Sequence, residues 1–136
     1  MTENEIGRIV VDAAVKVHKG LGPGLLESVY EVVLAKQLQK RGLRIQRQIP
    51  VPIVFEDDEF DEGFRADIVV NECVVLELKS VEQLHPVHAK QVQTYLKLTG
   101  YRLGFLLNFN EALMKNGIVR CVNGLPEDPD YKSLAS

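Results

Sequence analysis

The stretch that decides the fold is residues 63–79, which read GFRADIVVNECVVLELK. Two apolar runs rich in β-branched residues flank a short polar segment, a pattern that predicts two strands joined by a tight turn. Three ionisable side chains, Asp67, Glu77 and Lys79, interrupt these apolar runs. A charge in a buried strand is costly unless it is paired or binds a metal. The hairpin is therefore predicted to carry a functional site.

The length of the turn decides whether the two acids meet. A two-residue turn (71–72) would pair Asp67 with Leu76 and place Glu77 on the wrong face of the sheet. A three-residue loop (71–73), or a bulge, pairs Asp67 with Glu77 on one face. We predict the second arrangement, because a metal site requires the carboxylates to converge.

The residue types on this hairpin suit phosphodiester hydrolysis. Asp67 and Glu77 offer hard oxygen ligands for Mg²⁺ or Mn²⁺, and the backbone carbonyl of Leu78 is a further candidate ligand. Lys79 shares a strand face with Glu77 and can orient a water or stabilise charge that develops on phosphorus. The competing interpretation is an outward sheet face that carries an ordinary Glu–Lys pair.

Length and composition indicate one globular domain. The chain has 136 residues, 46% hydrophobic and 26% charged, with a net charge of −3. We expect a single domain over residues 1–136, with a core at about 5–122 and a polar tail at 123–136. No apolar run is long enough to span a bilayer, and the acidic N-terminus does not resemble a signal peptide, so we expect a cytoplasmic protein.

The charges and cysteines are distributed unevenly along the chain. Lys36 to Arg47 contains five cations and no acid, and Glu56 to Glu62 contains six acids and no cation. The basic stretch fits a phosphate backbone or, equally, a solvated helix end. The acidic stretch is predicted to form a loop. Cys73 and Cys121 lie in apolar runs and are expected to be buried free thiols.

Periodicity predicts the order α-α-β-β-β-α-β-β. Helical spacing and end signals predict helices at about 4–19, 25–41 and 86–99. Period-two or continuous apolar runs predict strands at about 43–55, 63–70, 73–79, 102–109 and 117–122. The strand–helix–strand unit around residues 86–99 indicates a parallel pair in a mixed sheet flanked by helices, an α/β (α+β) fold. Exposed edge strands make a homodimer a candidate assembly.

Three further motifs carry a family resemblance. Asp67 followed by Glu77-Leu78-Lys79 resembles the site of the PD-(D/E)xK nuclease superfamily, and residues 91–95 (QVQTY) fit the QxxxY signature of RecB-type exonucleases. Residues 24–30 (GLLESVY) fit the signature of the GxxExxY protein family within that superfamily. The resemblance covers about residues 5–122. It implies a restriction-endonuclease-like α-β-β-β-α-β core with an extra N-terminal helix and a C-terminal edge strand.

The resemblance also implies roles for residues outside the hairpin. Glu27 would join the two acids at the metal, and Gln91 and Tyr95 would bind the DNA backbone or position the active site. Arg65 and His88 are additional candidates for substrate binding.

The chain departs from the superfamily pattern at two places. Ala66 stands where the superfamily name has proline. RecB-type enzymes often have an upstream histidine ligand, a place that Glu27 takes here, with His18 as the alternative.

Two functions follow from these observations. The first is a Mg²⁺- or Mn²⁺-dependent nuclease that hydrolyses phosphodiester bonds with a metal-activated water, acting on DNA in preference to RNA. The alternative is a catalytically weak or inactive nuclease-fold module that binds nucleic acid or a nucleotide within a larger complex. A third hypothesis is a purely structural or regulatory partner protein.

Overall fold

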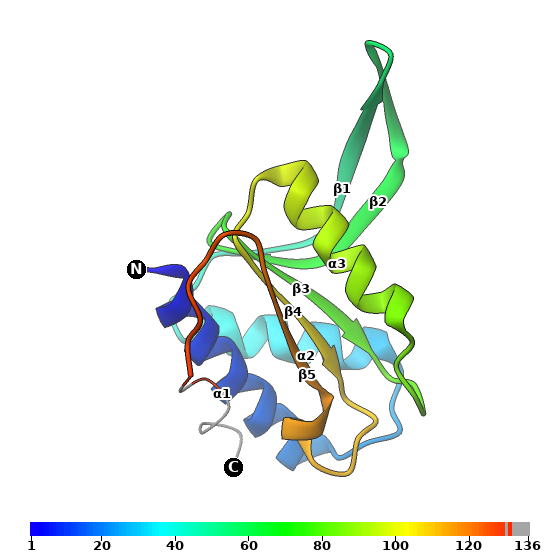
Figure 1. Cartoon of the computed structure of the whole chain (residues 1–136). Coiled ribbons are helices and arrows are strands. Elements are labelled where there is room, and N and C mark those ends of the chain that lie inside the picture. The colour runs from blue at the N-terminus through cyan, green and yellow to red at the C-terminus, as the bar shows by residue number, and fades with distance from the viewer. Residues whose placement is uncertain (130, 132–136) are drawn as a thin grey trace.

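The computed structural model describes residues 1–129 and 131, and it contains one five-stranded mixed sheet with strands in the order β1-β2-β3-β4-β5 (Figure 1). β3 and β4 are parallel, and the other neighbouring pairs are antiparallel. The predicted mixed α/β architecture is confirmed. The elements are α1 (Glu3–Leu21), α2 (Glu27–Lys40), β1 (Ile45–Phe55), β2 (Asp58–Val70), β3 (Val74–Lys79), α3 (Pro86–Thr99), β4 (Leu103–Asn108), η1 (Met114–Gly117) and β5 (Ile118–Val122).

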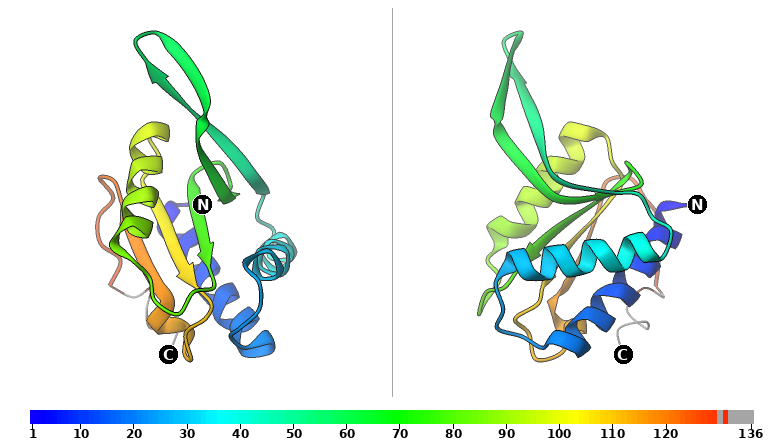
Figure 2. Two further views of the ribbon diagram at one scale, coloured as in Figure 1. Left: turned by 90° about the vertical axis from the view of Figure 1, so that its right-hand side faces the viewer. Right: turned by 180° about the vertical axis from the view of Figure 1, so that it is seen from behind.

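The helices cover the two faces of the sheet. α1 and α2 lie on one face and α3 lies on the other, as the two turned views show (Figure 2). Each face therefore has its own apolar cluster, and α1 and α2 pack over the larger one. β4 lies between them and is buried along its whole length. A strand covered on both faces needs a continuous apolar sequence, which is what residues 103–107 provide.

The helix ends follow local sequence signals. The Thr2 hydroxyl accepts a hydrogen bond from the backbone N–H of Glu5 and caps α1. Pro86 begins α3, where its missing N–H costs nothing. Gly100 ends α3 in the left-handed conformation (φ 77°), which glycine adopts without a steric penalty.

The register of the β2–β3 hairpin is the one that the metal-site argument required. Ile68 pairs with Leu76 and Val70 pairs with Val74, so the connection is the three-residue loop 71–73. The backbone N–H of Cys73 donates to the carbonyl of Val70 and closes this loop. The predicted register of the two strands is confirmed.

The prediction that the acidic stretch forms a loop is wrong. Residues 58–62 continue β2, and the turn is confined to Glu56 and Asp57, whose φ angles are 52° and 68°. A two-residue turn with both φ angles positive matches the twist of the flanking strands and holds them in a long hairpin. Sequence reasoning missed it because this turn type usually contains Asn or Gly.

The two sheet edges are β1 and β5, as the sequence predicted. The register of the β1–β2 pair shifts between Val51 and Ile53, around Pro52. Proline lacks the N–H that a ladder needs, which confines it to edges and irregularities. Both cysteines are free; Cys121 is buried as predicted, whereas Cys73 is only half-buried.

The chain after β5 turns back over α1. Arg8 donates two hydrogen bonds to the Asp128 carboxylate, at 2.9 and 3.0 Å. The predicted loose tail falls partly on residues 130 and 132–136, which lie outside the described residues. Within residues 1–129 and 131, no helix has the length and apolar character needed to cross a membrane.

The contact of β4 with α3 generates a stability prediction. A Cβ at Gly104 would lie 2.7 Å from Val75 Cγ1 and 2.8 Å from Val92 Cγ1. We expect Gly104→Val to lower the free energy of unfolding by about 1–3 kcal/mol, because the inserted atoms overpack the α3-side core. Gly20→Ala is the matched control, since a Cβ added there would meet nothing within 4 Å and alanine favours the helix. Urea unfolding measures both, and an unchanged midpoint for Gly104→Val would contradict the packing argument.

Candidate active site

The two acids of the hairpin lie opposite each other where β2 and β3 separate. The register that pairs Ile68 with Leu76, continued by one residue, sets Asp67 against Glu77. Beyond this point, Asp67 Oδ2 accepts a hydrogen bond from the backbone N–H of Leu78 at 2.8 Å. The Asp67 side chain thus forms a hydrogen bond to β3 at the point where backbone pairing between β2 and β3 has ended. The position of Asp67 is consequently fixed by the strand pairing itself.

Glu77 is a carboxyl group in an unfavourable electrostatic position. Its side chain is 8% exposed. Burial first, then a hydrogen bond with Asp67 and the charge of Asp67, raise the pKa of Glu77 to about 9; Glu27 adds to the rise and Lys79 opposes it. The two carboxyl groups therefore hold one proton between them near neutral pH, as close carboxylate pairs do. A site of this kind is suited to exchange its proton for a cation.

A polar network extends from Asp67 to α2 through the edge strand. The Gln48 amide nitrogen donates to Asp67 Oδ1 at 3.3 Å and to Glu31 Oε1 at 2.7 Å. Glu31 is buried and also forms an ion pair with Arg47, with 2.7 Å between Nη2 and Oε2. Gln48 has a φ of 53°, a left-handed conformation that is unusual for a residue other than glycine. The network thus holds the side of the Asp67 carboxylate that faces away from Leu78.

Glu27 is presented to the site by a loop that Tyr30 organises. The buried Tyr30 hydroxyl donates to the carbonyl of Gly22 at 2.6 Å and accepts from the N–H of Leu25 at 3.1 Å. The Ser80 hydroxyl, just beyond β3, donates to the carbonyl of Leu25 at 2.6 Å. These bonds place the first residue of α2 near the end of β3, where the charge of Glu27 acts on Glu77. A hollow of about 350 Å³ lies between Ser80 and residues 25–28.

Glu27 does not complete a preformed metal cluster. In the part of the chain that the structure describes, no three His, Cys, Asp or Glu side chains lie close enough together to hold a metal ion. Asp67 and Glu77 alone fit Mg²⁺ or Mn²⁺, because Mg²⁺ in particular is often held by one or two carboxylates while waters fill its other positions. The donor chemistry is therefore suitable, although Glu27 is solvent-exposed and stands apart from the pair.

Lys79 and His88 flank the carboxylate pair. Lys79 is half-buried and follows Glu77 by two residues, so both project from one face of β3. No ion pair within residues 1–129 and 131 involves Lys79. His88 Nδ1 accepts a hydrogen bond from the N–H of His85 at 3.1 Å, so neutral His88 carries its proton on Nε2. Burial, then the charges of Lys79 and His85, lower the pKa of His88, and Glu27 opposes this shift.

The other predicted substrate-binding residues are placed differently. Gln91 is exposed on α3, whereas Tyr95 is 2% exposed and packs between Phe64 and Tyr101, both at 5.9 Å between ring centroids. Burial, then Tyr101, raises the pKa of Tyr95 to about 12. Gln91 is therefore available at the surface for substrate binding, whereas the phenol of Tyr95 is part of the core.

The two remaining candidates serve contacts within the protein. Arg65 is exposed, and its guanidinium donates to the Gln48 carbonyl at 3.1 Å. His18 is buried, and its Nε2 donates to the carbonyl of Glu111 at 2.7 Å. This hydrogen bond holds α1 against the loop after β4. His18 therefore has a structural contact in addition to its predicted alternative role as a metal ligand.

Sequence reasoning missed Glu31 and Gln48. A weak signal existed, since Arg47 and Gln48 interrupt the apolar alternation of the strand, and Glu31 falls one helical turn after Glu27. The left-handed backbone at Gln48 has no sequence signature of its own. Their recognition required the register, which places Gln48 between the pairs Arg47–Ile68 and Ile49–Ala66, opposite Asp67.

The network predicts that Gln48 positions Asp67 for metal binding. Gln48→Asn tolerates the left-handed backbone but is too short to bridge both carboxylates. We expect its Mn²⁺ affinity to fall by about 10–100-fold, the usual effect of losing a group that orients a ligand. Calorimetric titration measures the affinity, with Gln46→Asn as the control because Gln46 is exposed on the same strand. Equal affinities for the two variants would refute the positioning role.

Comparison with known proteins agrees with this geometry. Residues 4–121 match a family model described as the PD-(D/E)XK nuclease superfamily. No curated protein and no solved structure matches the chain. The matched segment covers the described helices and strands except for the first residue of α1 and the last residue of β5, and it includes both acids of the hairpin and Lys79. The chain therefore belongs to the PD-(D/E)XK nuclease superfamily.

Proposed function

We propose that this chain is a nuclease that hydrolyses phosphodiester bonds in DNA and uses Mg²⁺ or Mn²⁺. Membership of the superfamily supports a nuclease-type function. The observation that carries the proposal is the register of β2 and β3, which, continued by one residue, sets the carboxyl groups of Asp67 and Glu77 opposite each other beside Lys79. Burial of the Glu77 carboxyl group beside a second acid is costly in a purely structural role, whereas a cation would compensate it.

The protein groups that would hold the cation are the Asp67 and Glu77 carboxylates, the Leu78 carbonyl and, with a shift toward the pair, Glu27. A bound divalent cation polarises a phosphoryl oxygen and lowers the pKa of a water ligand. The hydrogen bonds from Gln48 and Leu78 fix the Asp67 carboxylate, so little reorganisation is needed there when the cation binds.

Lys79 supplies positive charge on the face of β3 that carries Glu77. The reaction joins a water oxygen to phosphorus, breaks the bond from phosphorus to the leaving oxygen, and leaves a proton on that oxygen. The Lys79 ammonium stabilises the negative charge that accumulates on the phosphoryl group. His88 presents its Nε2–H as a donor near Lys79 and contributes to binding the phosphate.

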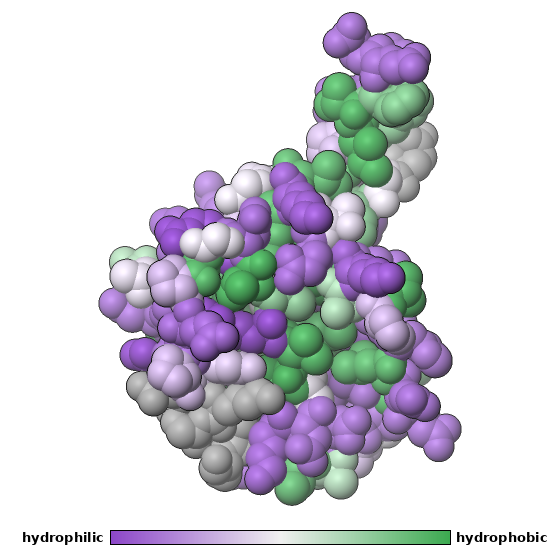
Figure 3. All heavy atoms as spheres, in the orientation of Figure 1, coloured by the Kyte–Doolittle hydropathy of each residue, from purple (hydrophilic) through white to green (hydrophobic). Residues whose placement is uncertain are grey.

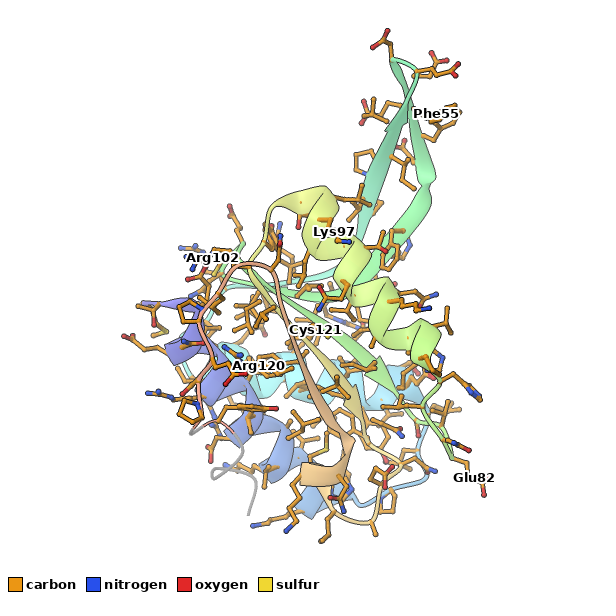
Figure 4. All side chains as sticks on the ribbon, in the orientation of Figure 1. Phe55, Glu82, Lys97, Arg102, Arg120 and Cys121 are labelled. Carbon is orange, nitrogen blue, oxygen red and sulfur yellow. The ribbon has the colours of Figure 1, made fainter. Side chains whose placement is uncertain are left out.

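The surface beside these residues suits a nucleic-acid strand. A hollow of about 690 Å³ is lined by the loop after β3 and by His85 and His88. Glu82, labelled in Figure 4, lies in this loop. Gln91 is exposed on the same helix as His88 and binds a phosphate or sugar, while the buried Tyr95 holds α3 in place. Arg65 is exposed near Gln48 and adds a cation.

The finer family assignment rests on the segment 24–30. We place the chain in the GxxExxY family, since its Gly24, Glu27 and Tyr30 match that signature. The contacts of Tyr30 give the spacing a physical reason. One helical turn separates Tyr30 from Glu27, so the phenol that orders the loop also orients the acid at the start of α2.

A nuclease-fold module that binds nucleic acid without cutting it is the second candidate. Two observations favour it: the net charge of −3, and the separation of Glu27 from the carboxylate pair in the described structure. Binding without cleavage would show a steep dependence on salt and no dependence on a divalent cation.

Cleavage assays distinguish these functions. Wild-type protein is incubated with linear, circular and single-stranded DNA and with RNA, in Mg²⁺ and in Mn²⁺. We expect cleavage of DNA by the wild type, none by Glu77→Ala, and a loss of about 100-fold or more in Lys79→Ala with Mn²⁺ binding retained. Lys97→Ala is the matched control, because Lys97 is an exposed lysine near the C-terminal end of α3, whereas His88 lies near its N-terminal end (Figure 4).

Each outcome has a defined meaning. Cleavage that survives in Glu77→Ala would indicate a contaminant or a misplaced site. Full activity in Lys79→Ala would show that the assigned role of Lys79 is wrong. Salt-dependent DNA binding with no cleavage in either metal would support the binding module in place of the nuclease.

A further inference from the structure

The hairpin of β1 and β2 ends in an arm, residues 53–60, that projects beyond the rest of the molecule (Figures 1 and 2). Large apolar side chains on it are exposed: Val54 by 67%, Phe55 by 65% and Phe60 by 47%. Figure 3 shows this apolar stem below a hydrophilic tip, and Figure 4 places Phe55 near the end of the arm. Adjacent exposed apolar side chains of this size mark an interaction surface.

One face of the arm carries both apolar and acidic side chains, with the acids toward the tip. Ile53 pairs with Phe60 and Phe55 pairs with Asp58, so these four side chains share a face. The turn at residues 56–57 adds two more acids at the tip. Such a tip repels phosphate, which excludes the arm as a clamp on nucleic acid. A surface that complements this face of the arm combines an apolar patch with cations.

Strand addition to β1 is hindered where the arm leaves the sheet. Pro50 and Pro52 lack the N–H groups that a new neighbouring strand would need, and they lie in the edge strand β1 just before the arm. The register shift after Val51 further interrupts the ladder. The exposed side chains of Phe55 and Phe60 are therefore the groups that the arm offers to a partner.

α2 carries a surface of the required kind on its outward side. Leu26, Val29 and Val32 are exposed by 74%, 38% and 50%. At 100° per residue, Lys36 and Lys40 continue the same side of the helix, opposite the residues that α2 buries. We call this row of five residues the α2 stripe. It is apolar in its first half and basic in its second half.

The arm and the α2 stripe match in length as well as in order. The apolar half of the stripe spans about 9 Å along the helix axis. On the arm, Ile53 and Phe55 lie about 7 Å apart along β1, with Asp58 beside Phe55 and the other acids of the tip at the turn. A hollow of about 210 Å³, lined in part by Leu21, Val33 and Gln37, adjoins the stripe and offers room for an aromatic ring.

We propose that the arm of one chain docks on the α2 stripe of a second copy, and that the second arm docks reciprocally to form a two-fold symmetric dimer. The apolar residues of the arm contact the apolar half of the stripe, and the acidic tip meets Lys36 and Lys40. Within one molecule this contact is not made, since Phe55 and Phe60 remain exposed. Both complementary surfaces belong to the same chain, which identifies a second copy as the occupant.

A charge-swap experiment tests this arrangement. Lys36→Glu/Lys40→Glu makes the stripe acidic, and Asp57→Lys/Asp58→Lys places two cations at the tip of the docking face. Each variant alone then opposes like charges in both contacts, and we expect its dimer dissociation constant to rise about tenfold or more. In an equimolar mixture, both contacts regain opposite charges, so a heterodimer forms. Sedimentation analysis of the full chain at low salt measures the assemblies.

Control variants separate docking from general charge effects. Lys90→Glu/Lys97→Glu makes the same change in net charge on α3, across the sheet from α2, and leaves the dimer intact. Circular dichroism confirms that each variant is folded. A wild-type chain that stays monomeric at its highest soluble concentration would overturn the proposal. So would swapped variants that dimerise as the wild type does, or a mixture that forms no heterodimer.

Discussion

The candidate active site depends on one constraint, the pairing of β2 with β3 that sets the buried carboxyl group of Glu77 against the half-buried carboxyl group of Asp67. Neither Asp67 nor Glu77 can move away without breaking the register that also aligns the core residues Ile68 and Leu76. The folded chain responds by keeping a proton on the pair, with the pKa of Glu77 raised to about 9. The unfolded chain releases that proton near pH 4.5, so the metal-free protein loses stability as the pH rises from there to about 9. A dication at this site would compensate the negative charge of both carboxylates.

The rest of the fold maintains this arrangement. The cluster under α1 and α2 and the cluster under α3 clamp β3 and β4 from both sides. The link from Glu31 through Gln48 connects α2 to Asp67, and the hydrogen bonds of Tyr30 hold the loop before α2. α2 thus serves two surfaces: its buried face and its first residue belong to the site, and its outward face offers the stripe to which an arm can dock. The proposed dimer and the candidate site would therefore share one helix.

Much of this organisation follows from local sequence signals. The order of elements, the ends of α3 and the parallel β3–β4 pair agree with periodicity and turn chemistry. The register of the central hairpin agrees with the requirement that the two acids converge. Three features do not follow from them. The turn at Glu56–Asp57 uses residues that rarely adopt positive φ, Gln48 joins the network only because the register sets it opposite Asp67, and the burial of Tyr95 depends on how α3 rotates against the sheet. For Gln48 and Tyr95 the tertiary structure decides, and it overrides residue preference, whereas the turn lies at the tip of the projecting arm and is set by the pairing of β1 with β2.

The shared proton of Asp67 and Glu77 can be counted. Calorimetric titration of the wild-type protein with Mn²⁺ at about pH 7.5, in buffers of different ionisation enthalpy, reports how many protons leave as the cation binds. With the pKa of Glu77 at about 9, one proton should be released for each Mn²⁺ bound, and Glu77→Gln should release none. Binding of Mn²⁺ to the wild type without proton release, or no binding at all, would contradict a carboxylate pair that exchanges its proton for a metal ion.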